Sequence, residues 1–188
     1  MLLPKIIDKT YKTKVYLFIK DGEYHKKYIS QNGFKKGVKE FLAKSTFPKE
    51  TQDYLKNFDC FTAGDLTVEP KEDSIKFKGN IYLLIDNKVY SSAEGLAVFA
   101  KESGLAILAG ETTKGDGIGS DSMQFSLPNS GFVIRYSKEM GVSQSGVINE
   151  LYATSPHIET KVRHDDDRPL PEREYIKAIL EREKISIE

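Results

Sequence analysis

The sequence predicts an α/β fold, and three observations support this class. Residues 81–85 (I-Y-L-L-I) form an apolar run that is too short for a helix and follows Gly79, as expected of an interior strand. A mostly apolar helix pattern begins after Ser91 and ends at Gly104. A second apolar strand follows at 105–109. A strand, a helix and a strand in this order form a crossover unit, so we expect a parallel sheet.

The elements before this unit follow weaker patterns. The first ten residues place apolar side chains on one face of a short helix, and residues 14–19 (K-V-Y-L-F-I) predict a buried strand. Residues 33–44 place apolar side chains on one helical face, and a second short helix begins at Pro48. Residues 57–78 are turn-rich and predict a connector with one short edge strand.

Two elements follow the unit. Short apolar segments at 123–127 and 132–136 flank the turn residues P-N-S-G and predict a hairpin at the edge of the sheet. Residues 171–183 have the apolar stripe of a closing helix.

Composition excludes several classes of protein. The 188 residues can bury one ordinary core, and 28 basic residues balance 28 acidic ones, so we expect no nucleic-acid partner. The lone Cys60 cannot form an internal disulfide, and no Cys/His cluster has zinc-ligand spacing. We therefore expect no metal and no cofactor. The chain carries no signal peptide and no membrane segment, so as given it is expected in the cytoplasm, although the intact protein's compartment stays open.

Ser91 is the first candidate for chemistry. It stands where a buried strand gives way to a helix, beside the unpaired N–H groups at the positive helix end, where an oxyanion would be stabilised. The segment Ser91-Ser92-Ala93-Glu94 also fits a capping box, in which Ser91 only caps the helix. The local pattern favours the cap and does not by itself decide between the two roles.

The glycine-rich loop at 110–119 does not fit a nucleotide site. After Gly115 a Walker motif needs Lys and then Ser or Thr, but Asp116 and Gly117 stand there. The glycine spacing is not that of a dinucleotide fingerprint either. A tightly turned or mobile surface loop is the simpler interpretation.

The order of motifs over residues 80–160 resembles the core of the tail-specific, C-terminal processing serine peptidases, including their tricorn-like branch. It comprises the strand, S-S-A-E, the buried helix, the second strand, G-E-x-T, the glycines, the hairpin with Leu-Pro and the segment P-x-I. The resemblance implies a crotonase-like α/β spiral core. It also implies Ser91 as nucleophile and the Ser92 N–H as an oxyanion donor.

The resemblance further implies how the chain is organised. We expect a single domain over 1–188, the C-terminal part of a peptidase catalytic domain that is incomplete at its N-terminus. Within it, 1–79 is a partial N-terminal portion and connector, 80–160 is the core with the nucleophile, and 161–188 is the closing helix. The family's glycine-rich loop with the second oxyanion donor would lie upstream of Met1.

The identity of the general base is the open point. One form of the family uses a lysine in the glycine loop, but that register falls on Asp116, with Lys114 two residues short and thus a candidate loop base. The other form uses Ser, His and Glu, and Glu150 stands where the acid is expected. The resemblance places the histidine of this form upstream, so the base is expected outside the chain rather than at the chain's three histidines, His25, His157 and His164.

The leading hypothesis is a serine-type endopeptidase that acts on polypeptide substrates, in particular extended C-terminal tails. The alternative is a catalytically inactive fragment or pseudo-peptidase that serves as a peptide-binding or assembly module. A third class, an acyl-thioester enzyme of the crotonase kind, fits the segment from Ser91 to Glu94 poorly. An incomplete sheet leaves apolar surface exposed, so we also expect a homo-oligomer or a partner segment.

Overall fold

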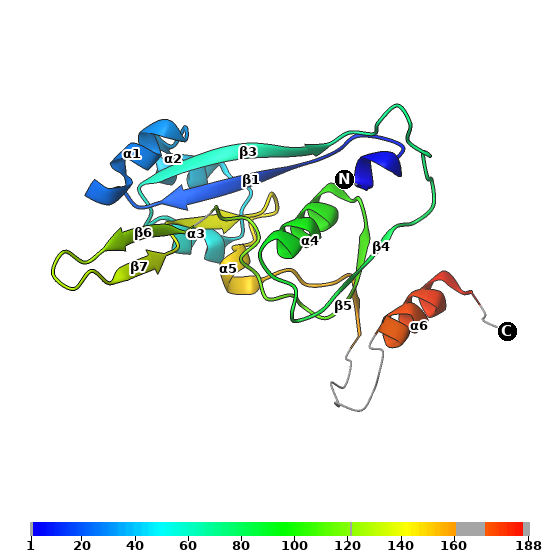
Figure 1. Ribbon diagram of the computed structural model, residues 1–188. Coiled ribbons are helices and arrows are strands. Elements are labelled where there is room, and N and C mark those ends of the chain that lie inside the picture. Colours follow the sequence, from blue (N-terminus) through cyan, green and yellow to red (C-terminus); the bar gives the residue numbers. More distant parts are fainter. Residues whose placement is uncertain (1, 121, 161–171, 186–188) are drawn as a thin grey trace. The chain divides into compact units, whose positions relative to one another are not determined.

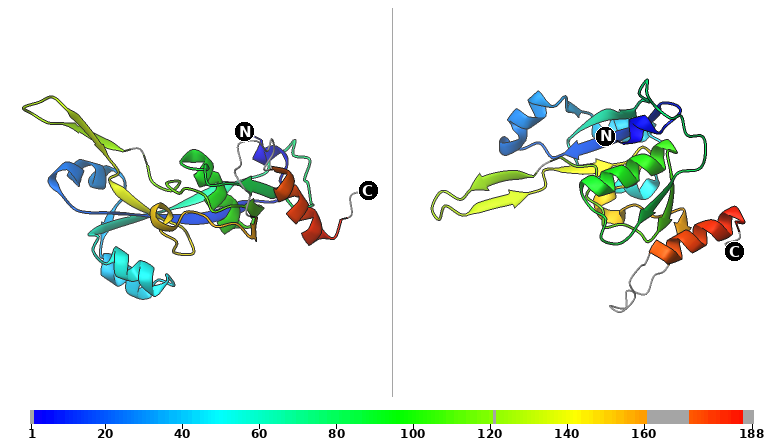
Figure 2. Two further views of the ribbon diagram at one scale, coloured as in Figure 1. Left: turned by 90° about the horizontal axis from the view of Figure 1, so that it is seen from below. Right: turned by 45° about the vertical axis from the view of Figure 1, so that its right-hand side comes forward.

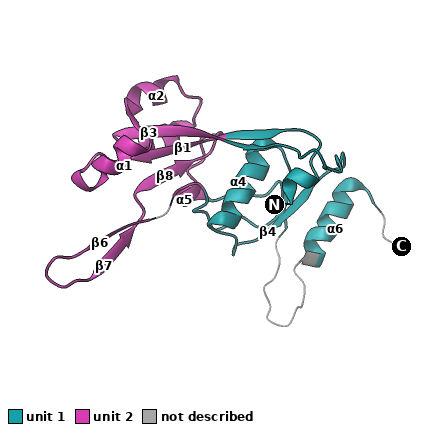
Figure 3. Ribbon diagram, turned by 45° about the horizontal axis from the view of Figure 1, so that its top comes forward, with its two compact units in different colours: residues 1–13, 66–117, 153–188 teal, residues 14–65, 118–152 magenta. Residues whose placement is uncertain are grey.

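The computed structural model describes residues 2–120, 122–160 and 172–185 and shows a mixed α/β fold with three sheets (Figure 1). The chain divides into two compact units (Figure 3). Unit 1 comprises Met1–Thr13, Leu66–Gly117 and Ala153–Glu188, and unit 2 comprises Lys14–Asp65 and Ile118–Tyr152. The expectation of one domain with boundaries at 79/80 and 160/161 stays a prediction.

The sheet of unit 1 confirms the predicted parallel pair. Strands β4 (Tyr82–Ile85) and β5 (Ile107–Gly110) are parallel neighbours, and β9 (Ile158–Glu159) adds to β5 in the same direction. The predicted helix is α4 (Ser92–Ser103), which connects β4 to β5 in the chain. It ends at Gly104, whose left-handed φ of 70° suits a residue without a Cβ.

The core of unit 1 forms between α4 and the sheet. Ala97 and Ala100 of α4 pack with Ile85 and Leu108 of the strands and with Ile7 from the N-terminal segment. The predicted N-terminal helix is shorter than expected, a 3₁₀ turn at Leu3–Lys5. The predicted closing helix is α6 (Glu172–Glu183), which contacts β5 and buries the side chain of Tyr175.

The sheet with the order β2-β3-β1-β8 belongs mostly to unit 2, while the start of β1 up to Thr13 and the end of β3 from Leu66 belong to unit 1. Strand β1 (Tyr11–Ile19) contains the predicted strand and starts three residues earlier; it pairs antiparallel with β8 (Glu139–Val142). Strand β3 (Cys60–Val68) pairs antiparallel with β2 (Lys35–Lys36). In the described part of the unit, the short helices are α1 (Lys26–Gln31), α2 (Val38–Lys44), α3 (Lys49–Leu55) and α5 (Asn149–Tyr152), with a 3₁₀ turn at Glu23–His25.

Two predictions in unit 2 are wrong in detail. The connector at 57–78 contains a nine-residue strand, β3, that lies inside the sheet rather than at its edge. Its residues alternate poorly because Gly64 and Asp65 interrupt the apolar pattern and most of its side chains are exposed. The helix expected at 33–44 begins only at Val38, because Gly37 takes a left-handed φ of 97° and the residues before it form β2.

The predicted hairpin exists, but it does not edge a larger sheet. Strands β6 (Met123–Ser126) and β7 (Val133–Tyr136) pair antiparallel and, among the described residues, form a two-stranded sheet of their own (Figure 2). The apolar residues that suggested a sheet edge are largely exposed, with Phe132 at 72% and Val133 at 61%. The pattern therefore reflected strand propensity rather than burial.

No described helix combines the length and apolar character that crossing a bilayer requires.

Candidate active site

Ser91 adopts a strained backbone conformation at the start of α4. Its φ is 57° and its ψ is −128°, and the residue is exposed. A non-glycine residue held there costs about 1–3 kcal/mol, so the surrounding structure must enforce it. A strained turn from strand to helix is also how α/β-hydrolases expose a nucleophilic serine.

The capping box is a wrong prediction. The Ser91 side chain makes no capping hydrogen bond to the described helix. Instead its N–H donates to the Gly115 carbonyl at 3.3 Å, and the fully buried Glu94 accepts from Thr154 Oγ1 at 2.6 Å through Oε1. The next N–H, that of Ser92, lies in the first turn, where an α-helix offers no intrahelical acceptor.

A buried network of three side chains fixes this first turn. Thr154 bridges two elements, because its N–H donates to Thr113 Oγ1 at 2.8 Å while its hydroxyl donates to Glu94. The Thr113 N–H in turn donates to the Thr154 carbonyl at 3.1 Å. The sequence pattern includes Thr113 only as the last residue of G-E-x-T and does not single out Thr154, because their partners lie 41 and 60 residues away in the chain.

The glycine loop packs backbone to backbone on the same turn. Lys114 N–H donates to the Val89 carbonyl at 2.8 Å, next to the bond between Ser91 and Gly115. A Cβ on Gly117 would lie 2.5 Å from the Gly95 nitrogen, so only glycine permits this approach. The loop is therefore held tightly against the segment that carries Ser91, which agrees with a tight turn and not with a mobile loop.

The predicted site residues fall into both units. Ser91, Ser92 and Lys114 belong to unit 1, where the bonds above bring their backbones together; the Lys114 side chain is exposed. Glu150 belongs to unit 2, in α5, where Oε1 accepts the Gly141 N–H at 3.0 Å. Added Cβ atoms on Gly119 and Gly141 would lie 3.5 and 3.0 Å from that oxygen, so the carboxylate sits against two glycine backbones.

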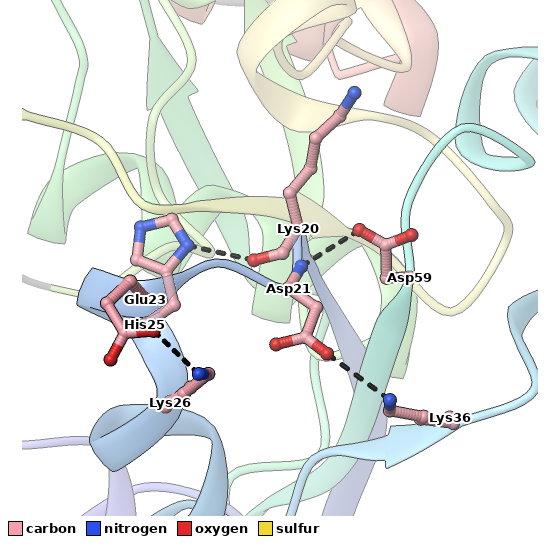
Figure 4. A network of polar contacts seen from close by, with 7 residues as sticks. All are labelled: Lys20, Asp21, Glu23, His25, Lys26, Lys36 and Asp59. Atoms are coloured by element: carbon pink, nitrogen blue, oxygen red, sulfur yellow. Dashed lines mark hydrogen bonds and ion pairs between the residues drawn. The ribbon is translucent and has the colours of Figure 1, made fainter.

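Two of the three histidines have identified partners. In unit 2, His25 Nδ1 contacts the Lys20 carbonyl at 2.8 Å, beside the ion pairs that Asp21 and Glu23 make with lysines (Figure 4). His25 Nε2 contacts the Tyr136 hydroxyl at 3.0 Å. In unit 1, His157 Nδ1 accepts the Leu108 N–H at 2.9 Å.

The environment of His157 favours its neutral form. Burial lowers the pKa of its imidazole, and the positive charges of Lys101 and Arg182 lower it further. The hydrogen bond from Leu108 also requires an unprotonated Nδ1. The third histidine, His164, lies outside the described residues.

A second cluster, in unit 2, forms around the buried Lys138 and Glu139 and was not predicted from the sequence. Lys138 Nζ donates to Ser120 Oγ at 2.6 Å and lies 4.6 Å from the centre of the Tyr28 ring. Glu139 accepts the Ser120 N–H at 2.7 Å and the Tyr28 hydroxyl at 2.9 Å, and burial is the main reason that the pKa of Tyr28 is raised. The cluster fixes Ser120, which directly follows Gly119 beneath the Glu150 carboxylate. No local sequence motif predicts this cluster.

Among residues 2–120, 122–160 and 172–185, no group of His, Cys, Asp and Glu side chains could hold a metal ion.

Comparisons with solved structures show the fold. The structure resembles that of mature CPAF complexed with lactacystin, with a TM-score of 0.55 and 18% identity over 84% of this chain and 35% of that chain. It also resembles a putative peptidase from Parabacteroides merdae, with a TM-score of 0.51 and 15% identity over 65% and 37% of the two chains. At such identities the likeness shows a fold that peptidases use.

The family follows from the sequence itself. The family model of Peptidase family S41 matches residues 9–160, so the chain belongs to that family of serine-type, C-terminal processing peptidases. The predicted resemblance is confirmed, and the match reaches upstream of residue 80. The chain spans about a third of the length of the solved chains named above. No curated protein sequence matches it.

Proposed function

We propose that the chain is a serine-type peptidase domain with Ser91 as the nucleophile. The observation that carries the proposal is the strained, exposed and uncapped serine at the start of α4. A serine that served only as a cap would use its hydroxyl on the helix, and this one does not. Its hydroxyl is thereby left for a substrate.

The proposed reaction uses this geometry directly. Ser91 Oγ forms a bond to the carbonyl carbon of the scissile peptide while its proton passes to the base, and the carbonyl oxygen becomes an oxyanion. The Ser92 N–H, at the positive end of α4, donates to that oxyanion. The C–N bond then breaks, the amine leaves with the proton from the base, and water hydrolyses the acyl-enzyme.

Glu150 is proposed as the acid that orients a histidine base from outside the chain. Its carboxylate is held by the Gly141 N–H, so its direction is fixed in unit 2 before any histidine arrives. Lys114 is the weaker candidate for the base, because its exposed side chain lacks the dry surroundings in which a lysine acts as one.

The proposed substrate is a polypeptide bound as an extended strand through a C-terminal tail, and membership of a family of C-terminal processing peptidases supports this proposal. The crotonase-like core and a homo-oligomeric state also stay proposals.

A catalytically inactive module that binds peptides is the second candidate. The observation that favours it is the engagement of both described histidines: His25 contacts the Lys20 carbonyl, and His157 accepts from a backbone N–H. In that case the strain at Ser91 would be a remnant of an active ancestor.

Labelling with a fluorophosphonate separates the two candidates. The probe is applied to the chain and to a version extended upstream with its own coding sequence. A peptidase gives labelling in at least the extended version, and Ser91→Ala abolishes it while Ser92→Ala, which keeps the backbone N–H, retains it. If neither version is labelled, the peptidase proposal fails.

A further inference from the structure

A cavity of about 330 Å³ opens on unit 1 at the C-terminal end of α4. Its lining includes apolar residues from the sheet side, among them Ile81 and the buried Leu105 and Ala106. Charged and aromatic side chains from two other segments, residues 8–11 and 77–80, complete the lining. A cavity of this size lies at the small end of the range that binds small molecules in proteins.

Backbone hydrogen bonds join residues 5–6 to residues 75–77, where the chain enters these two segments. The Ile75 N–H donates to the Lys5 carbonyl at 2.9 Å and the Phe77 N–H to the Ile6 carbonyl at 2.8 Å. The Phe77 ring lies against the backbone of Gly79, where an added Cβ would come within 2.5 Å of a ring atom. The wall of the cavity is thus formed before any ligand binds.

The lining carries an excess of positive charge. Among the described residues, Lys9, Lys78 and Lys101 line the cavity, against Asp8 as the single acidic residue. Lys101 is held in place because its Nζ donates to both the carbonyl and the Oγ of Ser155, each at 2.8 Å. These bonds use two of its three N–H donors, so one donor remains for a ligand.

The surroundings lower the pKa of two lining residues, a shift that a bound anion would oppose. Burial lowers the pKa of Lys101, and burial followed by the charge of Lys101 lowers the pKa of His157. A negative charge in the cavity would favour the protonated form of both groups.

The cavity is separate from the proposed catalytic serine. Ser91 precedes the first residue of α4, whereas the cavity lies beside Lys101 and Gly104 at its other end. The 12 residues of α4 span about 18 Å at the usual helical rise. A molecule in the cavity therefore does not reach Ser91.

We propose that this cavity binds a small organic anion, a carboxylate or phosphate group attached to an apolar or ring-shaped body. The three lysines neutralise the anionic group. The rings of Tyr11 and Phe77 and the apolar lining accept the body of the ligand. The site is independent of the peptidase proposal, because it contains no residue of the proposed catalytic set.

Binding is tested on the whole chain by backbone amide NMR with four probes: 3-phenylpropanoate, phenyl phosphate, the neutral 3-phenylpropanamide and inorganic phosphate. We expect saturable shifts from the first two at residues 8–11, 77–81 and 101–107. The neutral amide should leave these signals in place, and inorganic phosphate, which lacks the ring, should bind more weakly. A preference for one of the two organic anions identifies the anionic group.

Matched variants test the charges. The double variant Lys9→Gln/Lys78→Gln removes two exposed lysines and should weaken binding about tenfold, as two partly screened ion pairs would. Lys88→Gln removes an equally exposed lysine of unit 1 outside the cavity and should change nothing, and Ser91→Ala should bind like wild type. The proposal is overturned if neither organic anion gives saturable shifts at the cavity, if the amide binds equally well, or if the double variant binds like wild type.

Discussion

The segments that carry Ser91 and Glu150 are held in place by different means. Around Ser91, glycines at 95 and 117 let the backbone of the loop approach α4 closely, next to the buried polar network of Glu94, Thr113 and Thr154. Around Glu150 the neighbouring loop is held by buried charged side chains, Lys138 and Glu139, on Ser120. Glycines and serines leave a visible pattern in a sequence, whereas a buried lysine looks like any other lysine. The first segment could therefore be recognised from sequence and the second could not.

The largest expected effect comes from Gly117→Ala. The new Cβ would lie 2.5 Å from the Gly95 nitrogen and 2.6 Å from the Glu94 carbonyl carbon, and neither backbone can move freely. We expect a loss of about 3 kcal/mol in the free energy of unfolding. Urea denaturation measures it, with Gly64→Ala as control because no atom lies within 4 Å of a Cβ there. Equal effects of the two substitutions would show that the close approach is not needed.

Lys138→Met tests the segment next to Glu150 and should lower the free energy of unfolding by about 2 kcal/mol. It removes a buried charged hydrogen bond and a cation–π contact while keeping the apolar stem. Lys56→Met removes an exposed lysine that pairs with Asp53 and should cost less than about 0.5 kcal/mol. If both variants unfold at the same urea concentration, side chains do not hold this segment.

Because the backbone of Ser91 is strained, glycine and alanine variants should rank in opposite orders of stability at positions 91 and 92. At position 91 glycine should be more stable than alanine by about 1 kcal/mol, because glycine adopts the positive φ without cost. At position 92, inside the helix, alanine should be more stable than glycine by about 0.5–1 kcal/mol. Thermal unfolding of the four variants decides the point. The same order at both positions would remove the argument from strain.

These comparisons also explain what the sequence could predict. The parallel strands and α4 follow from local apolar runs with clear ends, and the family resemblance located Ser91 among them. The capping-box prediction was wrong because the Glu94 carboxylate accepts a hydrogen bond from Thr154, which lies 60 residues away and outside the local pattern. Strand β3 was predicted as a short edge strand, and its length and interior position were wrong because its pairing partners, not its own side chains, specify them.

The smallest expected effect is the change of folding stability with pH that His157 causes. Its pKa is lowered in the folded chain, so the unfolded chain binds the proton first as the pH falls. The contribution of the neutral His157 to the free energy of unfolding is complete above about pH 6.5, the usual pKa of a histidine. It is lost as the pH falls through the lower pKa of the folded chain. Urea denaturation at several pH values should show this loss in wild type and not in His157→Gln. A wild type that becomes more stable relative to the variant as the pH falls would contradict the assigned environment.

The central claim is that Ser91 is an activated nucleophile rather than a helix cap. Tandem mass spectrometry of the fluorophosphonate adduct, on the chain extended upstream, locates the modified residue directly. The account predicts one adduct, on Ser91, formed equally in wild type and in Lys88→Gln. An adduct on Ser92 or Ser120 with Ser91 unmodified would contradict it.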